Sequence, residues 1–327
     1  MTSGRELSPR QARHLIREGA WTGPTAGFAP GYLQANLLIV PAVAADAFQD
    51  YCVRNPRPCP LLERLASGDP EPRHTAPGAD IRRDLPRYRR YLRGGALEEI
   101  TDISTLWTED SVGFLLGCSF SFEEALARAG LKPRHLEQGR NVSMYRTNRV
   151  TAPAGPFAGP LVVSMRPMPA DRVGEVYDIT ARFVLAHGAP VYHGDPAGLG
   201  IADLDRPEWG EACTIHSGEV PVFWACGVTS QVAVIHALEQ GAISWAIGHA
   251  PGHMFITDLP AEETGTRADG KTGRRTDGQT IRYCRHSSPS YPPPVSSARK
   301  SVINMCPGAW PMAQEMAPCS RACITAT

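Results

Sequence analysis

The sequence predicts an α/β protein with a mixed-sheet core, a smaller inserted α+β subdomain and a disordered C-terminal tail. Three observations support this prediction. Strand-like apolar runs alternate with helical patterns up to about residue 260, two strand–turn–helix units share one pattern, and the composition changes after Pro260. We expect residues 5–130 and 211–260 to form the core and residues 131–210 the inserted subdomain. Residues 261–327 are rich in Gly, Pro, Ser and Thr and form the predicted tail.

The N-terminal part of the predicted core contains a helix, a strand and a second helix. Ser8 and Gln11 have the spacing of a capping box, with proline at the first helical position, and Gly19 ends this helix. Residues 33–41 form an apolar run that ends in proline and predicts a buried strand. A helix is expected over residues 44–54, before a proline-rich segment that excludes regular structure.

Two later segments repeat one pattern, in which a strand leads through a cysteine and a tight turn into a helix. Residues 111–117 form the first strand, which is followed by Cys118. Residues 220–225 form the second, which is followed by Cys226 and a helix to about residue 238. The expected helix caps are Ser121 in the first unit and Thr229 or Ser230 in the second.

Each unit places a thiol beside a helix N-terminus, where free N–H groups and the helix dipole attract anions. The same environment lowers the pKa of a neighbouring thiol. The functional interpretation is a pair of polar turns that bind a carboxylate, with Ser119, Gly227 and Thr229 as substrate contacts. The alternative is that two buried cysteines pack at tight turns. The sequence leaves both interpretations open.

The predicted subdomain has strand-like segments near residues 142, 161 and 191 and a helical pattern over residues 170–186. Arg146 and Arg166 lie in two of these strands, and arginine suits bidentate recognition of a carboxylate. The alternative for each is a surface or salt-bridged arginine.

Three histidine-containing patterns are candidates for chemistry. His253, which lies near His249 and Asp258, is a candidate general base near neutral pH. His187, His193 and Asp195 are donor types that hold divalent metals, although their spacing is no specific signature and the nearby glycines and prolines favour a shaped turn. We expect neither a metal nor another cofactor.

Composition excludes several classes of protein. Lys plus Arg and Asp plus Glu each total 33, and this balance argues against a dedicated nucleic-acid binder. No apolar run approaches the ~20 residues that span a bilayer. The first residues lack the apolar segment of a secretion signal, so we expect a cytoplasmic protein with reduced thiols. Zero net charge does not oppose self-association into a homo-oligomer.

Several short strings, in order along the chain, resemble the bacterial "putative hydro-lyase" family, which is related to the mitochondrial D-glutamate cyclase. They include QANL at 34–37, NPRPCP at 55–60, GCSFSFE at 117–123, MYRTN at 144–148, VSMRP at 163–167, HGAP at 187–190, PVFWACGVT at 221–229 and HAPGHM at 249–254. The resemblance implies an α/β lyase that eliminates water, with cyclisation of D-glutamate to 5-oxo-D-proline as its best-defined activity. It assigns no catalytic residues, and the chain after Pro260 departs from the family pattern.

The residues themselves suggest a mechanism for such a reaction. The turns at Cys118 and Cys226 would stabilise a developing oxyanion, Arg146 or Arg166 would hold a carboxylate, and His253 would transfer protons. This hypothesis requires both sulfur-bearing turns to meet in one crevice. Its rivals are a non-catalytic protein that binds an amino acid or carboxylate, and a metal-dependent lyase or hydrolase that uses His187, His193 and Asp195.

Overall fold

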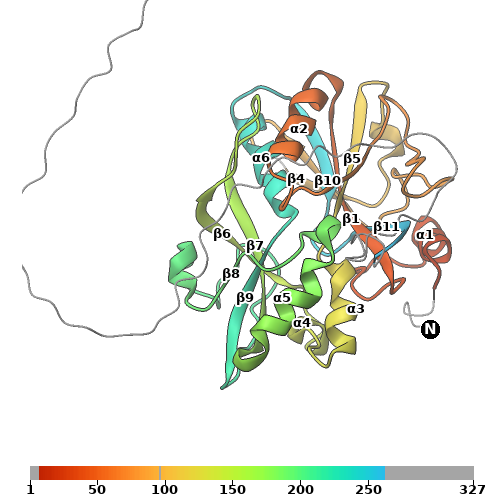
Figure 1. Ribbon diagram of the computed structural model, residues 1–327. Helices are drawn as coiled ribbons and strands as arrows, with labels where there is room; N and C mark the ends of the chain where they lie inside the picture. Colours follow the sequence, from red (N-terminus) through yellow and green to blue (C-terminus); the bar gives the residue numbers. More distant parts are fainter. Residues whose placement is uncertain (1–6, 96, 262–327) are drawn as a thin grey trace, which may run out of the picture. The chain divides into compact units, whose positions relative to one another are not determined.

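The computed structural model describes residues 7–95 and 97–261, so the tail predicted from residue 261 onward lies, apart from Ala261, outside the described residues. Figure 1 shows two β-sheets with helices packed around them. The predicted α/β class is confirmed, and each strand pairing in the described part of the chain is antiparallel.

The larger sheet is built around β1 (Tyr32–Pro41), which pairs with three other strands. Its strand order is β2 (Leu61–Arg64), β5 (Ser111–Gly117), β1, β10 (Trp245–His249), β3 (Tyr88–Leu92) and β4 (Leu97–Ile100), and β11 (Phe255–Pro260) also pairs with β1. Successive residues of β1 point to opposite faces, Leu38 into one apolar cluster and Leu37 into another. Both faces are therefore covered, which explains why the strand is a continuous apolar run.

Helices cover one face of the larger sheet. α2 (Ala42–Arg54) and α6 (Val228–Glu239) share an apolar cluster with β1, β5 and β10 and lie together in the upper part of Figure 1. The opposite face packs against the segment between β2 and β5, through side chains that include Ile81 and Leu85. The predicted strand over 33–41 and helix over 44–54 are confirmed.

The smaller sheet has the strand order β6 (Ser143–Val150), β7 (Pro160–Pro169), β9 (Glu219–Ala225) and β8 (Tyr192–His193). α3 (Phe120–Arg128) and α5 (Val173–Ala181) pack against one of its faces around Trp224. The division into a core and an inserted subdomain stays a prediction. The strand pairing differs from this division at one strand. β9, which the sequence placed with the core, pairs with β7 and β8.

The remaining helices are short. α1 (Pro9–Arg17) has the predicted capping box, since the backbone N–H of Ser8 donates to Gln11 Oε1 at 2.9 Å and that of Gln11 to Ser8 Oγ at 3.4 Å. The others are α4 (Arg134–Glu137) and the 3₁₀ turns η2 (Ser104–Leu106), η3 (Ala170–Arg172), η4 (Val184–Ala186) and η5 (Pro196–Leu199). None of the helices described is long and apolar enough to cross a membrane.

Candidate active site between two sulfur-bearing turns

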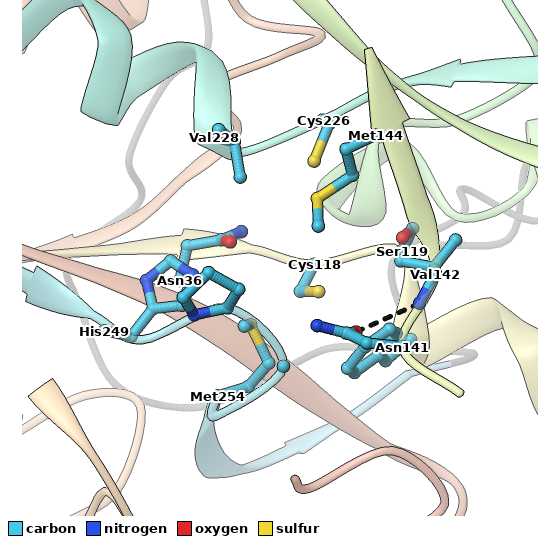
Figure 2. A pocket seen from close by; sticks show the side chains of 13 residues that line it. Asn36, Cys118, Ser119, Asn141, Val142, Met144, Cys226, Val228, His249 and Met254 are labelled. Atoms are coloured by element: carbon cyan, nitrogen blue, oxygen red, sulfur yellow. Dashed lines mark hydrogen bonds between the residues drawn. The ribbon is translucent and has the colours of Figure 1, made fainter. Parts of the chain in front are cut away.

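Cys118 and Cys226 line the same pocket. It is a small pocket with a cavity volume of about 20 Å³, and it is partly open to solvent. Figure 2 shows both sulfur atoms directed into it, with the thioether of Met144 between them in this view. The lining residues are Asn36, Cys118, Ser119, Phe120, Asn141, Val142, Met144, Cys226, Val228, His249, Pro251, Gly252 and Met254. The five segments that supply them lie far apart in the sequence and come from both sheets.

The two turns are built alike. The backbone N–H of Cys118 donates to Gln34 of β1, and that of Cys226 donates to Val162 of β7, so each cysteine extends the hydrogen bonding of its strand. The next helix then begins two residues later, at Phe120 and Val228. The first helical N–H of each unit donates to the cysteine sulfur. Each thiol therefore lies at the positive end of a helix.

The helices begin earlier than the sequence predicted, and the expected caps are wrong. Ser121, Thr229 and Ser230 lie within the first helical turns, and no side chain caps either helix. Ser121 Oγ instead accepts the N–H of Gln34 at 3.0 Å, and Thr229 Oγ1 accepts that of Val162 at 3.0 Å. These hydroxyls fasten the helices to neighbouring strands, a tertiary role that local sequence does not reveal.

Burial dominates the chemistry of both thiols. It raises the pKa of Cys118 to about 12 and that of Cys226 to about 11, although the donated N–H bonds act in the opposite direction. Both groups are therefore neutral thiols at pH 7.

Asn36 of β1 connects the two turns. Its Nδ2 donates to the carbonyl of Gly117 at 2.8 Å and to that of Leu116 at 3.3 Å. On its other side it lies so close to Gly227 that a Cβ there would be 2.3 Å from Asn36 Nδ2. Glycine at 227 is thus required by the close approach of this amide, and a direct substrate contact is not needed to explain it.

The histidine in the pocket is His249, whereas His253 is not among the lining residues. His249 Nδ1 lies 3.2 Å from the carbonyl of Leu37, and Gln231 Nε2 lies 3.2 Å from the same ring nitrogen. Burial lowers the pKa of His249 to about 4, so the ring is neutral at pH 7. His253 Nδ1 is directed at the carbonyl of Pro251 at 2.9 Å. Its predicted role in proton transfer stays untested, and the histidine that lines the pocket is His249.

Arg166 is fully buried behind the pocket. Its guanidinium donates to Glu123 Oε1 at 3.0 and 2.5 Å and to Ser119 Oγ at 3.0 Å. Burial alone would raise the pKa of Glu123, but His135 and Arg166 outweigh it and hold that pKa at about 2. Arg166 therefore reaches the pocket through Ser119, and does not itself line it.

Other predicted residues lie away from the pocket. Arg146 is exposed and its guanidinium stacks over Trp209, 5.2 Å from the ring centre. Thr229 is fully buried against β7. Asp258 forms an ion pair with Arg13 at 2.9 Å. These positions supply no direct contact for a ligand in this pocket.

The three residues of the metal hypothesis are held by separate partners. His187 Nδ1 lies 2.7 Å from the carbonyl of Arg57, and His193 Nδ1 lies 3.2 Å from the Tyr177 hydroxyl. Asp195 Oδ1 accepts the N–H of Ala197 at 3.0 Å. Within the described ranges, no group of three or more His, Cys, Asp or Glu side chains is arranged to hold a metal ion.

Sequence reasoning missed Asn36 and Asn141 and ranked His249 below His253. A signal for Asn36 was present, because a lone amide inside the apolar run of a central strand must satisfy its hydrogen bonds within the core. Asn141 and His249 lie in segments whose placement depends on the packing of other strands, and neither carries a comparable local signal.

Two fully buried histidines, His187 and His249, predict a loss of stability in mild acid. Burial lowers the pKa of His187 and of His249 from 6.5 to about 4, so the unfolded chain binds more protons between these values. The contribution of each neutral histidine to the free energy of unfolding is therefore complete above pH 6.5. It is lost as the pH drops toward 4, by on the order of 3 kcal/mol for each histidine. Chemical denaturation at pH 7.0, 5.5 and 4.5 measures the free energy of unfolding. The H187Q variant should lose about half as much of this free energy between pH 7.0 and 4.5 as the wild-type protein does. A denaturant midpoint that does not change between pH 7.0 and 4.5 contradicts the prediction.

The family model and the curated relatives point to the same family. Residues 112–258 match the family model described as D-glutamate cyclase. A protein of Stutzerimonas stutzeri named "Putative hydro-lyase" is 55% identical over 265 residues, which cover 81% of this chain and 98% of the relative. A protein of the same name from Rubrobacter xylanophilus is 56% identical, over 76% of this chain and 94% of its own length.

A relative from Bacillus licheniformis, also named as a hydro-lyase, is 50% identical over 80% of this chain and 98% of its own length. Among solved structures, a nitrogen repressor-like protein from Methanococcus jannaschii matches with a TM-score of 0.33 and 10% identity, over 78% of this chain and 99% of its own. That likeness is too low to carry an argument.

Proposed function

The chain belongs to the D-glutamate cyclase family of hydro-lyases, and on this premise we propose that it converts D-glutamate to 5-oxo-D-proline with loss of water. The observation that carries the proposal is the convergence of both sulfur-bearing turns, each with a helix N-terminus, on one small pocket. Oriented N–H groups at helix starts stabilise negative charge on an oxygen, which is what carboxyl chemistry requires.

The charge of the pocket suits a small anion. Among its lining residues, all of which are described, none is Lys, Arg, Asp or Glu, and His249 is neutral because burial lowers its pKa to about 4. The positive ends of α3 and α6 therefore supply the attraction, together with the amide group of Asn141. D-Glutamate carries one net negative charge at neutral pH, so it suits a site that has no charged side chain and lies at the start of two helices.

The reaction balances without a further reactant. The α-amine nitrogen forms a bond to the carbon of the γ-carboxyl group (Cδ), and one oxygen of that carboxyl group leaves with two protons from the original ammonium group as water. The other oxygen becomes negative in the transition state, where the turn at Cys118 or Cys226 stabilises it. The neighbouring thiols relay the protons from nitrogen to the leaving oxygen. Arg166 acts indirectly in this scheme, by orienting the Ser119 hydroxyl.

Turnover of amino acids by the full chain tests the proposal. D-Glutamate should lose 18 mass units, detected by mass spectrometry, and L-glutamate and D-glutamine serve as comparison substrates. C118A and C226A should each lower turnover at least about 100-fold, because each removes a group that faces the reacting atoms. The matched control is C213A, since Cys213 is equally buried but lies outside the pocket.

Thermal unfolding of the same variants separates chemistry from packing. If C118A and C226A lose stability in proportion to turnover, the two cysteines have only a packing role. Stabilisation of the protein by amino or hydroxy acids without any turnover would instead support a non-catalytic binding protein and overturn the proposed lyase.

A further inference from the structure

The two thiols have a property that lactam formation does not require, which is their near-equivalence. Both follow the last residue of a strand, both accept the N–H of the residue two positions later, and both are almost fully buried, at 7% and 8% exposed. The pocket receives one from β5 of the larger sheet and the other from β9 of the smaller sheet. The two thiols therefore reach the pocket from two different structural layers, and Figure 2 shows Cys226 above Cys118 with the thioether of Met144 between them in this view.

Few other groups in the pocket can exchange a proton. The imidazole of His249 is engaged by Leu37 and Gln231, and the hydroxyl of Ser119 is held by Arg166. No carboxylate or ammonium group is present among the lining residues, all of which lie in the described part of the chain. The cysteines are therefore the pair of groups best placed to remove and return a proton on a bound carbon acid.

We propose that Cys118 and Cys226 give this site a second activity, the exchange and inversion of the α-proton of a small amino acid or of its lactam. The substrate class rests on the proposed function, whereas the two-thiol arrangement does not. One thiol first ionises to water. Its thiolate then takes the α-proton and becomes a thiol, while the electron pair of the C–H bond moves toward the carboxylate.

The opposite thiol completes the step. It donates its proton to the other face of the α-carbon and becomes the thiolate, so atoms and charge balance and nothing is oxidised or reduced. The helix N-termini of α3 and α6 stabilise the extra negative charge on the carboxylate oxygens during transfer. The proton leaves one face and returns to the other, which inverts the α-carbon.

Deuterium exchange tests this activity independently of water loss. The full chain is incubated in D₂O with 5-oxo-D-proline and, separately, with 5-oxo-L-proline, which cannot cyclise further. The α-proton signal is followed by NMR, and the antipode is measured by chiral chromatography. The wild-type protein should exchange the α-proton of both antipodes and interconvert them.

Single variants give the sharper result. C118S and C226S should each lower inversion at least about 100-fold. Each should retain exchange of one antipode only, and the two variants should retain opposite antipodes, because one thiol reaches one face of the α-carbon. C213S is the matched control and should behave as the wild type, and circular dichroism confirms that each variant is folded.

The outcomes separate the two proposals. Water loss from D-glutamate without α-exchange by the wild-type protein overturns the two-thiol activity and leaves the proposed function intact. Exchange without water loss supports the thiol pair and overturns the proposed function. If both variants lose α-proton exchange of the same antipode, the two-thiol assignment is also overturned. That result would place both sulfurs on the same face of the α-carbon.

Discussion

Replacement of Gly117 by alanine is expected to lower the free energy of unfolding by more than about 3 kcal/mol. A Cβ at this position would lie 1.5 Å from the carbonyl oxygen of Leu185 and 2.7 Å from its carbonyl carbon. Those atoms belong to the backbone, so no side-chain rotation relieves the overlap. Strand β5 and the turn η4 would have to separate, and Cys118 would move with them.

Gly113 supplies a matched control on the same strand. A Cβ there would lie 2.7 Å from Ile81 Cδ1, the mobile end of a side chain that can rotate away. We expect G113A to cost about 1 kcal/mol, at the lower end of what overpacking costs. Chemical denaturation followed by tryptophan fluorescence compares the two variants with the wild type. Equal losses in both would show that the backbone contact at Gly117 is not limiting.

Replacement of Glu123 by glutamine should cost about 3–5 kcal/mol, because it leaves the buried guanidinium of Arg166 without a counter-charge. Glu123 is 3% exposed and Arg166 is fully buried, and their shortest N–O distance is 2.5 Å. The matched control is D46N, which makes the same chemical change at a carboxylate whose side chain is 91% exposed and which pairs with Arg64. Exposed pairs contribute about 1 kcal/mol or less.

A double variant shows whether the cost arises from the unpaired charge. Replacing Glu123 by leucine and Arg166 by methionine together removes both charges, so it should be less destabilising than E123Q alone. Urea denaturation at pH 7 measures all three variants. If E123Q is no more destabilising than D46N, the Arg166–Glu123 pair contributes little and its role is confined to orienting Ser119.

Local patterns in the sequence predicted individual elements well. The capping box at Ser8, the apolar run of β1 and the two strand–cysteine–helix units all appear in the structure near their predicted bounds. The bonds that form such elements join residues a few positions apart or repeat with a regular period, so a short window of sequence contains the relevant information.

The contents of the site were less predictable. Arg166 was expected to hold a substrate carboxylate, but it is paired with Glu123, which lies 43 residues away in the chain. Cys118 and Cys226 do line one pocket, and they reach it from antiparallel strands of two different sheets. Neither fact follows from the spacing of these residues.

By itself, the sequence determined the α/β class, the family and the presence of two thiols at strand ends before helices. Only the tertiary structure decided that both thiols share a pocket, that Asn36 bridges their turns and that His249 replaces His253 beside them. The physical reason is the range of the interactions involved. Helix and strand formation depends on nearby residues, whereas the contact of Asn36 with Gly117 joins positions 81 residues apart and forms only when the sheets and helices pack.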